Sequence, residues 1–163
     1  MIKEKLKIIG EELNYSIPRV KELMDSAYQT NNFGEIKKIA QAQEQKGAAY
    51  LDVNIGSLPV EMMASVAMAV QNVVKIPLCF DSDDVSKLEK ALDVYDYNFG
   101  IPILNSATEA RLDNVLKLKN KKDFQLVLLV SERLNEGVLT ANNFGEDAYK
   151  TAKVFDPVKI DIS

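Results

Sequence analysis

The chain has 163 residues with a formal net charge of −4, one cysteine and no histidine. The acidic balance argues against nucleic acid as a partner, the lone cysteine excludes an internal disulfide and fits the cytoplasm, and the missing histidine disfavours zinc hydrolysis and Ser-His-Asp chemistry. No apolar run approaches the roughly 18 residues that span a bilayer, so we expect a cytoplasmic, non-membrane protein whose residues 1–163 form one domain.

The first part of the chain predicts one strand and two helices. Residues 5–10 form the expected first strand, and residues 10–14 form the expected loop after it. Ser16 and Pro18 have the pattern of an N-cap followed by a proline in the first turn. Apolar residues at helical spacing over residues 36–43 predict the second helix.

Strands and helices then alternate through the middle of the chain. Each predicted strand is a short apolar run, and each predicted helix begins at a capping residue or a proline. The strands are expected at residues 49–54, 77–81 and 101–105, and the helices after them begin near Pro59, Asp83–Asp84 and Thr108.

The last part of the chain predicts two more strands. Residues 124–130 are the most continuously apolar run, as expected of a strand covered on both faces. Residues 131–145 show no period and are expected to form a loop, followed by a short helix over 147–154 and a sixth strand over 158–162. This alternation predicts a parallel sheet with outer helices, either closed as a barrel or open and doubly wound. The Rossmann and phosphate-loop motifs are absent, which gives nucleotide binding little support.

Acids and amides stand at or near the ends of several predicted strands. In a parallel sheet, such residues share the crevice at the carboxyl edge. A carboxylate accepts two N–H bonds side by side and an amide both donates and accepts, so the set suits a flat heterocycle such as a pterin better than a magnesium ion. The alternative is that they cap helices or bond to loop amides. These residues are Asp52, Asn54, Asp81, Asn105 and Asp161.

Four stretches together resemble a known family, the pterin-binding methyltransferases. These enzymes are related to dihydropteroate synthase and act on methyltetrahydrofolate with a corrinoid protein. Any one stretch is weak evidence, whereas four in the same order and spacing are fairly specific. They are Ile8-Ile9-Gly10-Glu11, Leu51-Asp52-Val53-Asn54-Ile55-Gly56, Pro77-Leu78-Cys79-Phe80-Asp81-Ser82 and Leu104-Asn105-Ser106.

The resemblance implies a TIM-type (β/α) barrel with the pterin at the carboxyl ends of the strands. By this likeness Asp81, Asn105 and Asp161 contact the pterin, and Asp52 and Asn54 line the site. Asn14 matches the asparagine of the family's first loop. No metal site is implied.

Two departures from the family pattern bear on function. Glu12 stands where the family usually has arginine. A full barrel takes about 250 residues, and the chain ends at the sixth predicted strand. We therefore expect an incomplete barrel of about five to six parallel strands with outer helices. The family's asparagine that approaches the reacting nitrogen has no counterpart, so the catalytic residue is unknown. Open barrel edges favour a homo-oligomer or a second subunit that covers them.

Two functions remain open at this point. The first is a methyltransferase of one-carbon metabolism, with a tetrahydrofolate derivative as substrate and cobalamin carried by a partner corrinoid protein. The second is a catalytically inactive folate-binding or assembly module of such a system. The dihydropteroate synthase reaction is a remoter reading, because it needs a pyrophosphate site and the sequence shows no basic loop for one.

Overall fold

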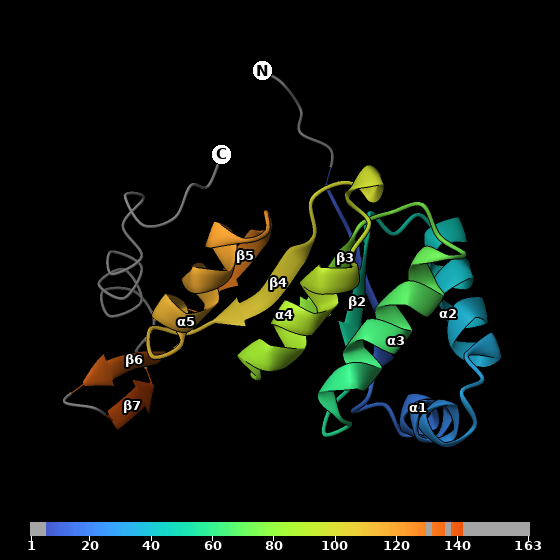
Figure 1. Ribbon diagram of the computed structural model, residues 1–163, viewed down its shortest axis with the longest axis horizontal. Coiled ribbons are helices and arrows are strands. Elements are labelled where there is room, and N and C mark those ends of the chain that lie inside the picture. The colour runs from blue at the N-terminus through green and yellow to red at the C-terminus, as the bar shows by residue number, and fades with distance from the viewer. Residues whose placement is uncertain (1–5, 130–131, 136–137, 142–163) are drawn as a thin grey trace.

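The computed structural model describes residues 6–129, 132–135 and 138–141 (Figure 1). Strands and helices alternate along most of this part. The strands are β1 (Ile9–Asn14), β2 (Tyr50–Asn54), β3 (Leu78–Asp81), β4 (Ile103–Ala107), β5 (Gln125–Leu128), β6 (Glu132–Asn135) and β7 (Val138–Ala141). The helices are α1 (Pro18–Thr30), α2 (Gly34–Gln45), α3 (Val60–Gln71), α4 (Val85–Val94) and α5 (Leu112–Leu116), with short 3-10 helices at Tyr97–Phe99 and Lys117–Asn120.

Five strands form one parallel sheet in the order β1-β2-β3-β4-β5. The helices α2, α3 and α4 lie along one side of this sheet (Figure 1). A doubly wound sheet would reverse its strand order and carry helices on both faces, whereas sequential order with helices outside is the arrangement of a barrel. In the described part of the chain the sheet is not closed. The predicted fold class, an incomplete (β/α) barrel, is therefore confirmed.

The two faces of the sheet have different neighbours, because successive side chains of a strand point to opposite faces. Val53 and Phe80 are fully buried and belong to the large core shared with the helices. Tyr50, Cys79 and Ile103 form a second, smaller apolar cluster. Their strand positions alternate with those of the first group, so this cluster lies on the face turned away from the helices.

The first strand begins later than the sequence predicted. Residues 5–10 were expected as the strand and 10–14 as a loop, but β1 runs to Asn14. Leu13 explains the difference, because it is fully buried and pairs in register with Val53 of β2. Leu6 and Ile8, assigned to the strand from sequence, are 85% and 57% exposed.

The start of the first helix also differs in one respect. Pro18 occupies the first turn of α1 as predicted, but the N-cap is Ile17. The Ser16 hydroxyl instead donates to Asn14 Oδ1 at 2.7 Å. The expected N-cap role of Ser16 is therefore wrong.

The end of the described chain departs most from expectation. The predicted strand over 124–130 is shorter, and Gln125 is exposed while the rest of β5 is half-buried, so it is not covered on both faces. The predicted loop over 131–145 contains β6 and β7, which pair antiparallel. The predicted helix at 147–154 and strand at 158–162 lie outside the described residues. Within the described ranges, none of the helices combines the length and apolar character needed to cross a bilayer.

Candidate functional site

The carboxyl edge of the sheet brings polar side chains from three neighbouring strands together. Asp81 of β3 pairs in register with Asn105 of β4, so the two residues share a face at the inter-strand spacing of about 4.8 Å. Asn54, at the end of β2, donates from Nδ2 to Asp81 Oδ2 at 2.8 Å. The Ser82 backbone N–H donates to the Asn105 carbonyl at 2.9 Å, which holds the end of β3 against β4.

Asp52 lies two positions before Asn54 in β2, so the two side chains share the same face of the sheet. It is 2% exposed, and its Oδ1 has no hydrogen-bond partner among the described residues. The pKa of this carboxyl is raised from its ordinary 3.8 to about 6, mainly by burial and in smaller part by the nearby Asp81 charge, while Cys79 and Asn105 oppose the shift. Asp52 is therefore a buried acid that holds its proton up to mildly acidic pH, beside a second acid.

The alternative interpretation of these residues was that they cap helices or bond to loop amides. The loop-amide role holds for Asn54, whose Oδ1 accepts from the Gly56 N–H, whereas the structure gives the capping of α4 to another group. The N-cap of α4 is Asp84, whose carboxylate accepts from the Ser86 N–H at 2.9 Å. The Ser82 hydroxyl accepts from the Asp84 N–H at 3.1 Å. Among the described residues, the Asp81 carboxylate accepts a hydrogen bond only from Asn54. Its other lone pairs are available to a ligand at this edge.

The loop after β2 fixes the orientation of Asn54. The Gly56 N–H donates to Asn54 Oδ1 at 2.8 Å. Gly56 has φ 54°, and a Cβ added there would overlap the ring of Tyr15, so only glycine fits. The Lys87 ammonium, from the first part of α4, donates to the Gly56 carbonyl at 2.6 Å. Lys87 is 8% exposed.

Sequence reasoning missed Lys87 as part of this region. Nothing in the spacing of α4 distinguishes it from an ordinary surface lysine, since its contact joins residues 31 positions apart. Gly56 carried a signal, because it ends the Asp-x-Asn-x-Gly stretch, but no pattern in the sequence explains why glycine is needed there.

The two remaining predicted site residues, Asn14 and Asp161, are not joined to this group by a side-chain hydrogen bond in the described part of the chain. Asn14 pairs in register with Asn54, so it lies at the same edge. Its Oδ1, however, accepts from the Ser16 N–H and hydroxyl in a local turn. Asp161 lies outside the described residues. The structure thus brings together Asp52, Asn54, Asp81 and Asn105.

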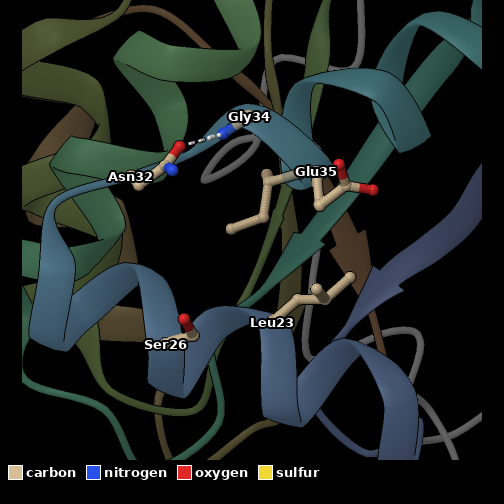
Figure 2. A pocket seen from close by; sticks show the side chains of 6 residues that line it. Leu23, Ser26, Asn32, Gly34 and Glu35 are labelled. Carbon is tan, nitrogen blue, oxygen red and sulfur yellow. Dashed lines mark hydrogen bonds between the residues drawn. The ribbon is translucent and has the colours of Figure 1, made fainter.

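Two hollows that are lined by described residues lie away from this edge. One, of about 130 Å³, sits between α1 and the start of α2, where Leu23 and Ser26 face the segment of Asn32 and Glu35 (Figure 2). The Asn32 side chain there accepts from the Gly34 N–H at 3.0 Å (Figure 2). This bond satisfies one backbone N–H at the start of α2, and no strand-end acid lines the hollow.

The second hollow, of about 410 Å³, lies at the ends of α3 and α4. It includes Gln71, whose Oε1 accepts from the Asp96 N–H at 2.6 Å. The Gln71 Nε2 also donates to the Val94 carbonyl at 3.4 Å, so this side chain joins the ends of the two helices. Within the described ranges, no group of three or more His, Cys, Asp or Glu side chains is arranged to hold a metal ion.

Comparison with known proteins gives two matches. Residues 10–161 match the family described as CdhD, the CO dehydrogenase/acetyl-CoA synthase delta subunit. Over 80 residues the chain is 40% identical to a methylcorrinoid:tetrahydrofolate methyltransferase of Eubacterium limosum. That stretch covers 47% of this chain and 28% of the relative, so the match spans well under half of that protein's length.

Proposed function

We propose that this chain, which belongs to the CO dehydrogenase/acetyl-CoA synthase delta subunit (CdhD) family, binds the pterin ring of a tetrahydrofolate derivative at the carboxyl ends of β2, β3 and β4. Residues 1–163 act as one pterin-binding domain in this proposal. The observation that carries it is the Asn54–Asp81 hydrogen bond beside Asn105, next to a buried Asp52 oxygen that has no hydrogen-bond partner among the described residues.

The chemistry of a pterin matches this group of side chains. A pterin presents an exocyclic amino group and a ring N–H side by side, and the two oxygens of Asp81 suit such a donor pair. The Asn105 amide can donate to a ring nitrogen or carbonyl and accept from an N–H. Because Asn54 already holds one Asp81 oxygen, the carboxylate is oriented before the ligand arrives.

Methyl exchange with a corrinoid protein is the function we propose for the bound ring. The Eubacterium limosum relative is named for transfer between a methylcorrinoid and tetrahydrofolate. By analogy, the cobalamin is carried by a partner protein and the folate is the substrate held here. Breaking the bond to the folate nitrogen requires a proton or hydrogen bond at that nitrogen. We assign no described residue to that step, so this site binds and orients the ring.

The second candidate is a folate-binding or assembly module without chemistry. It is favoured by the open sheet, since β1 and β5 are its outer strands in the described part of the chain. The outer edge of such a strand has unpaired backbone N–H and C=O groups that can pair with another chain. We propose that a second copy or a second subunit covers these edges. Sedimentation at low protein concentration tests it, and a stable monomer without partner would count against it. The wider likeness to dihydropteroate synthase also remains a prediction.

Calorimetric titration of methyltetrahydrofolate into the protein tests the site. Asp81→Asn removes the charge that pairs with the ring donors, and hydrogen bonds to charged groups contribute about 1.5–3 kcal/mol. We therefore expect affinity to fall roughly 10- to 100-fold. Asp93→Asn, an exposed acid on α4, is the matched control and should bind as the wild type does. Equal affinity in wild type and Asp81→Asn would overturn the proposed site.

A methylation assay then separates the two candidates. Reduced cobalamin and methyltetrahydrofolate are mixed with the protein, and methylcobalamin formation is followed by absorbance. Formation that depends on Asp81 supports the methyltransferase function. Tight folate binding without methylation supports the binding module.

A further inference from the structure

We infer that Lys87 is a positioning residue for the pterin site, acting on Asp81 through Gly56 and Asn54. This inference rests on the proposed pterin binding. It assigns a role to a residue that touches none of the strand-end acids in the hydrogen bonds described.

The burial of Lys87 calls for an explanation. Lysine is almost never fully buried unless it is paired, and removing an ammonium from water is costly without a strong partner. Lys87 is 8% exposed, and in the described part of the chain its ammonium bonds to a carbonyl, that of Gly56, with no carboxylate within ion-pair distance. At 2.6 Å this is a short, charge-assisted hydrogen bond. The Lys87 ammonium therefore holds the loop after β2 in place.

The fixed loop in turn sets the direction of the Asn54 amide. A backbone N–H can only donate, so the Asn54 atom that faces the Gly56 N–H must be the oxygen. The Asn54 NH₂ group is then forced toward Asp81, where it donates to Oδ2 at 2.8 Å. Released from Gly56, the amide could rotate, and the Asp81 carboxylate would lose its hold.

The three hydrogen bonds connect the start of α4 to the end of β3 through the loop after β2. Asp81 ends β3, and Lys87 lies six positions later in the following helix, by 87 − 81. The path from Lys87 to Gly56, Asn54 and back to Asp81 joins these two positions through the neighbouring unit, with bonds of 2.6, 2.8 and 2.8 Å. The Tyr15 side chain also lies close against Gly56.

The test is a double-mutant comparison of methyltetrahydrofolate affinity. Lys87→Met keeps an unbranched apolar stem and removes the terminal ammonium donor. Loss of a residue that orients a metal ligand typically lowers metal affinity or activity ~10- to 100-fold, and by analogy we expect methyltetrahydrofolate affinity to fall about 10-fold in the Lys87→Met protein. In the Asp81→Asn background the same change should have less than a ~2-fold effect, because the group that Lys87 orients is gone. Lys90→Met, an exposed lysine of the same helix, is the control.

A merely structural lysine would give a different result. If Lys87→Met lowers affinity by the same factor in both backgrounds, Lys87 does not act through Asp81 and the inference is overturned. Asn54→Ala breaks the path at its other link. It should lower affinity in the same way and make the lysine change silent.

A second readout needs no ligand. The side-chain amide resonance of Asn54 in the free protein reports its bond to Asp81, and we expect it to move in Lys87→Met and to stay in Lys90→Met. An unchanged resonance in Lys87→Met overturns the inference. Failure of the wild type to bind methyltetrahydrofolate would refute the proposed function alone, since the amide resonance still decides the role of Lys87.

Discussion

Asp52 gives the most quantitative prediction, because its burial has a direct cost in stability. The pKa of this carboxyl rises from 3.8 to about 6 in the folded chain, mainly through burial. At 1.36 kcal/mol per pKa unit this difference corresponds to a cost of about 3 kcal/mol when the group is ionised, as an upper estimate.

The sign of the pH dependence follows from proton binding. Between about pH 4 and pH 6 the folded chain holds the Asp52 proton more tightly than the unfolded chain does. The contribution of Asp52 to the free energy of unfolding is therefore most favourable below about pH 4 and falls as pH rises to about 6, beyond which the cost is complete. Asp52→Asn keeps the shape and cannot ionise, so this variant escapes the cost.

Urea unfolding at pH 7.5 and pH 4 is the assay. We expect Asp52→Asn to be more stable than the wild type by about 2–3 kcal/mol at pH 7.5 and by little at pH 4. The exposed Asp93→Asn control should differ from the wild type by less than about 0.5 kcal/mol at both values. If Asp52→Asn is destabilised equally at both pH values, the carboxylate is ionised and stabilised in the fold, and our reading of the site electrostatics is wrong.

Two further predictions concern the scaffold of the site. Gly56→Ala should destabilise the protein by at least about 2 kcal/mol, because it adds overlap with Tyr15 to the strain of a positive φ. Gly47→Ala, also at positive φ but with open space around it, should cost only about 1 kcal/mol, and equal losses in thermal unfolding would contradict the overlap. Phe80→Ala should cost about 3–5 kcal/mol, because this side chain is fully buried between the sheet and the helices. A loss below 1 kcal/mol in urea unfolding would mean that the core is not packed as described.

The sequence was sufficient where short-range patterns decide the structure. Apolar runs that end in an acid or amide located β2, β3 and β4 to within about two residues, and their parallel pairing then placed Asp81 beside Asn105. The alternation of strands and helices in the sequence did not predict the sequential strand order or the placement of the helices on one side of the sheet. The choice of barrel over doubly wound sheet came from the family resemblance.

The errors arose where long-range contacts override local character. Glu11 and Glu12 look like a loop, yet they lie in β1 because Leu13 is buried beside β2 and the register shifts between Gly10 and Leu13. The hairpin of β6 and β7 was read as a loop because Glu132, Arg133 and Asn135 give β6 no apolar period.

The properties of the candidate site also depend on long-range contacts that local sequence patterns do not predict. The spacing of the chain placed Asp52 at a strand end, but the high pKa of its carboxyl depends on what covers it in three dimensions. The contact of Lys87 with Gly56 joins two units of the fold and leaves no trace in either helix or strand pattern. The predicted pterin contacts of Asp81, Asn105 and Asp161 remain predictions.

Chemical-shift mapping with methyltetrahydrofolate tests the central claim most directly, because it locates the ligand as well as detecting it. We predict that the side-chain amides of Asn54 and Asn105 shift most, while that of Asn32, in the hollow beside α2, stays in place. Shifts centred on Asn32, with Asn54 and Asn105 unmoved, would contradict the account.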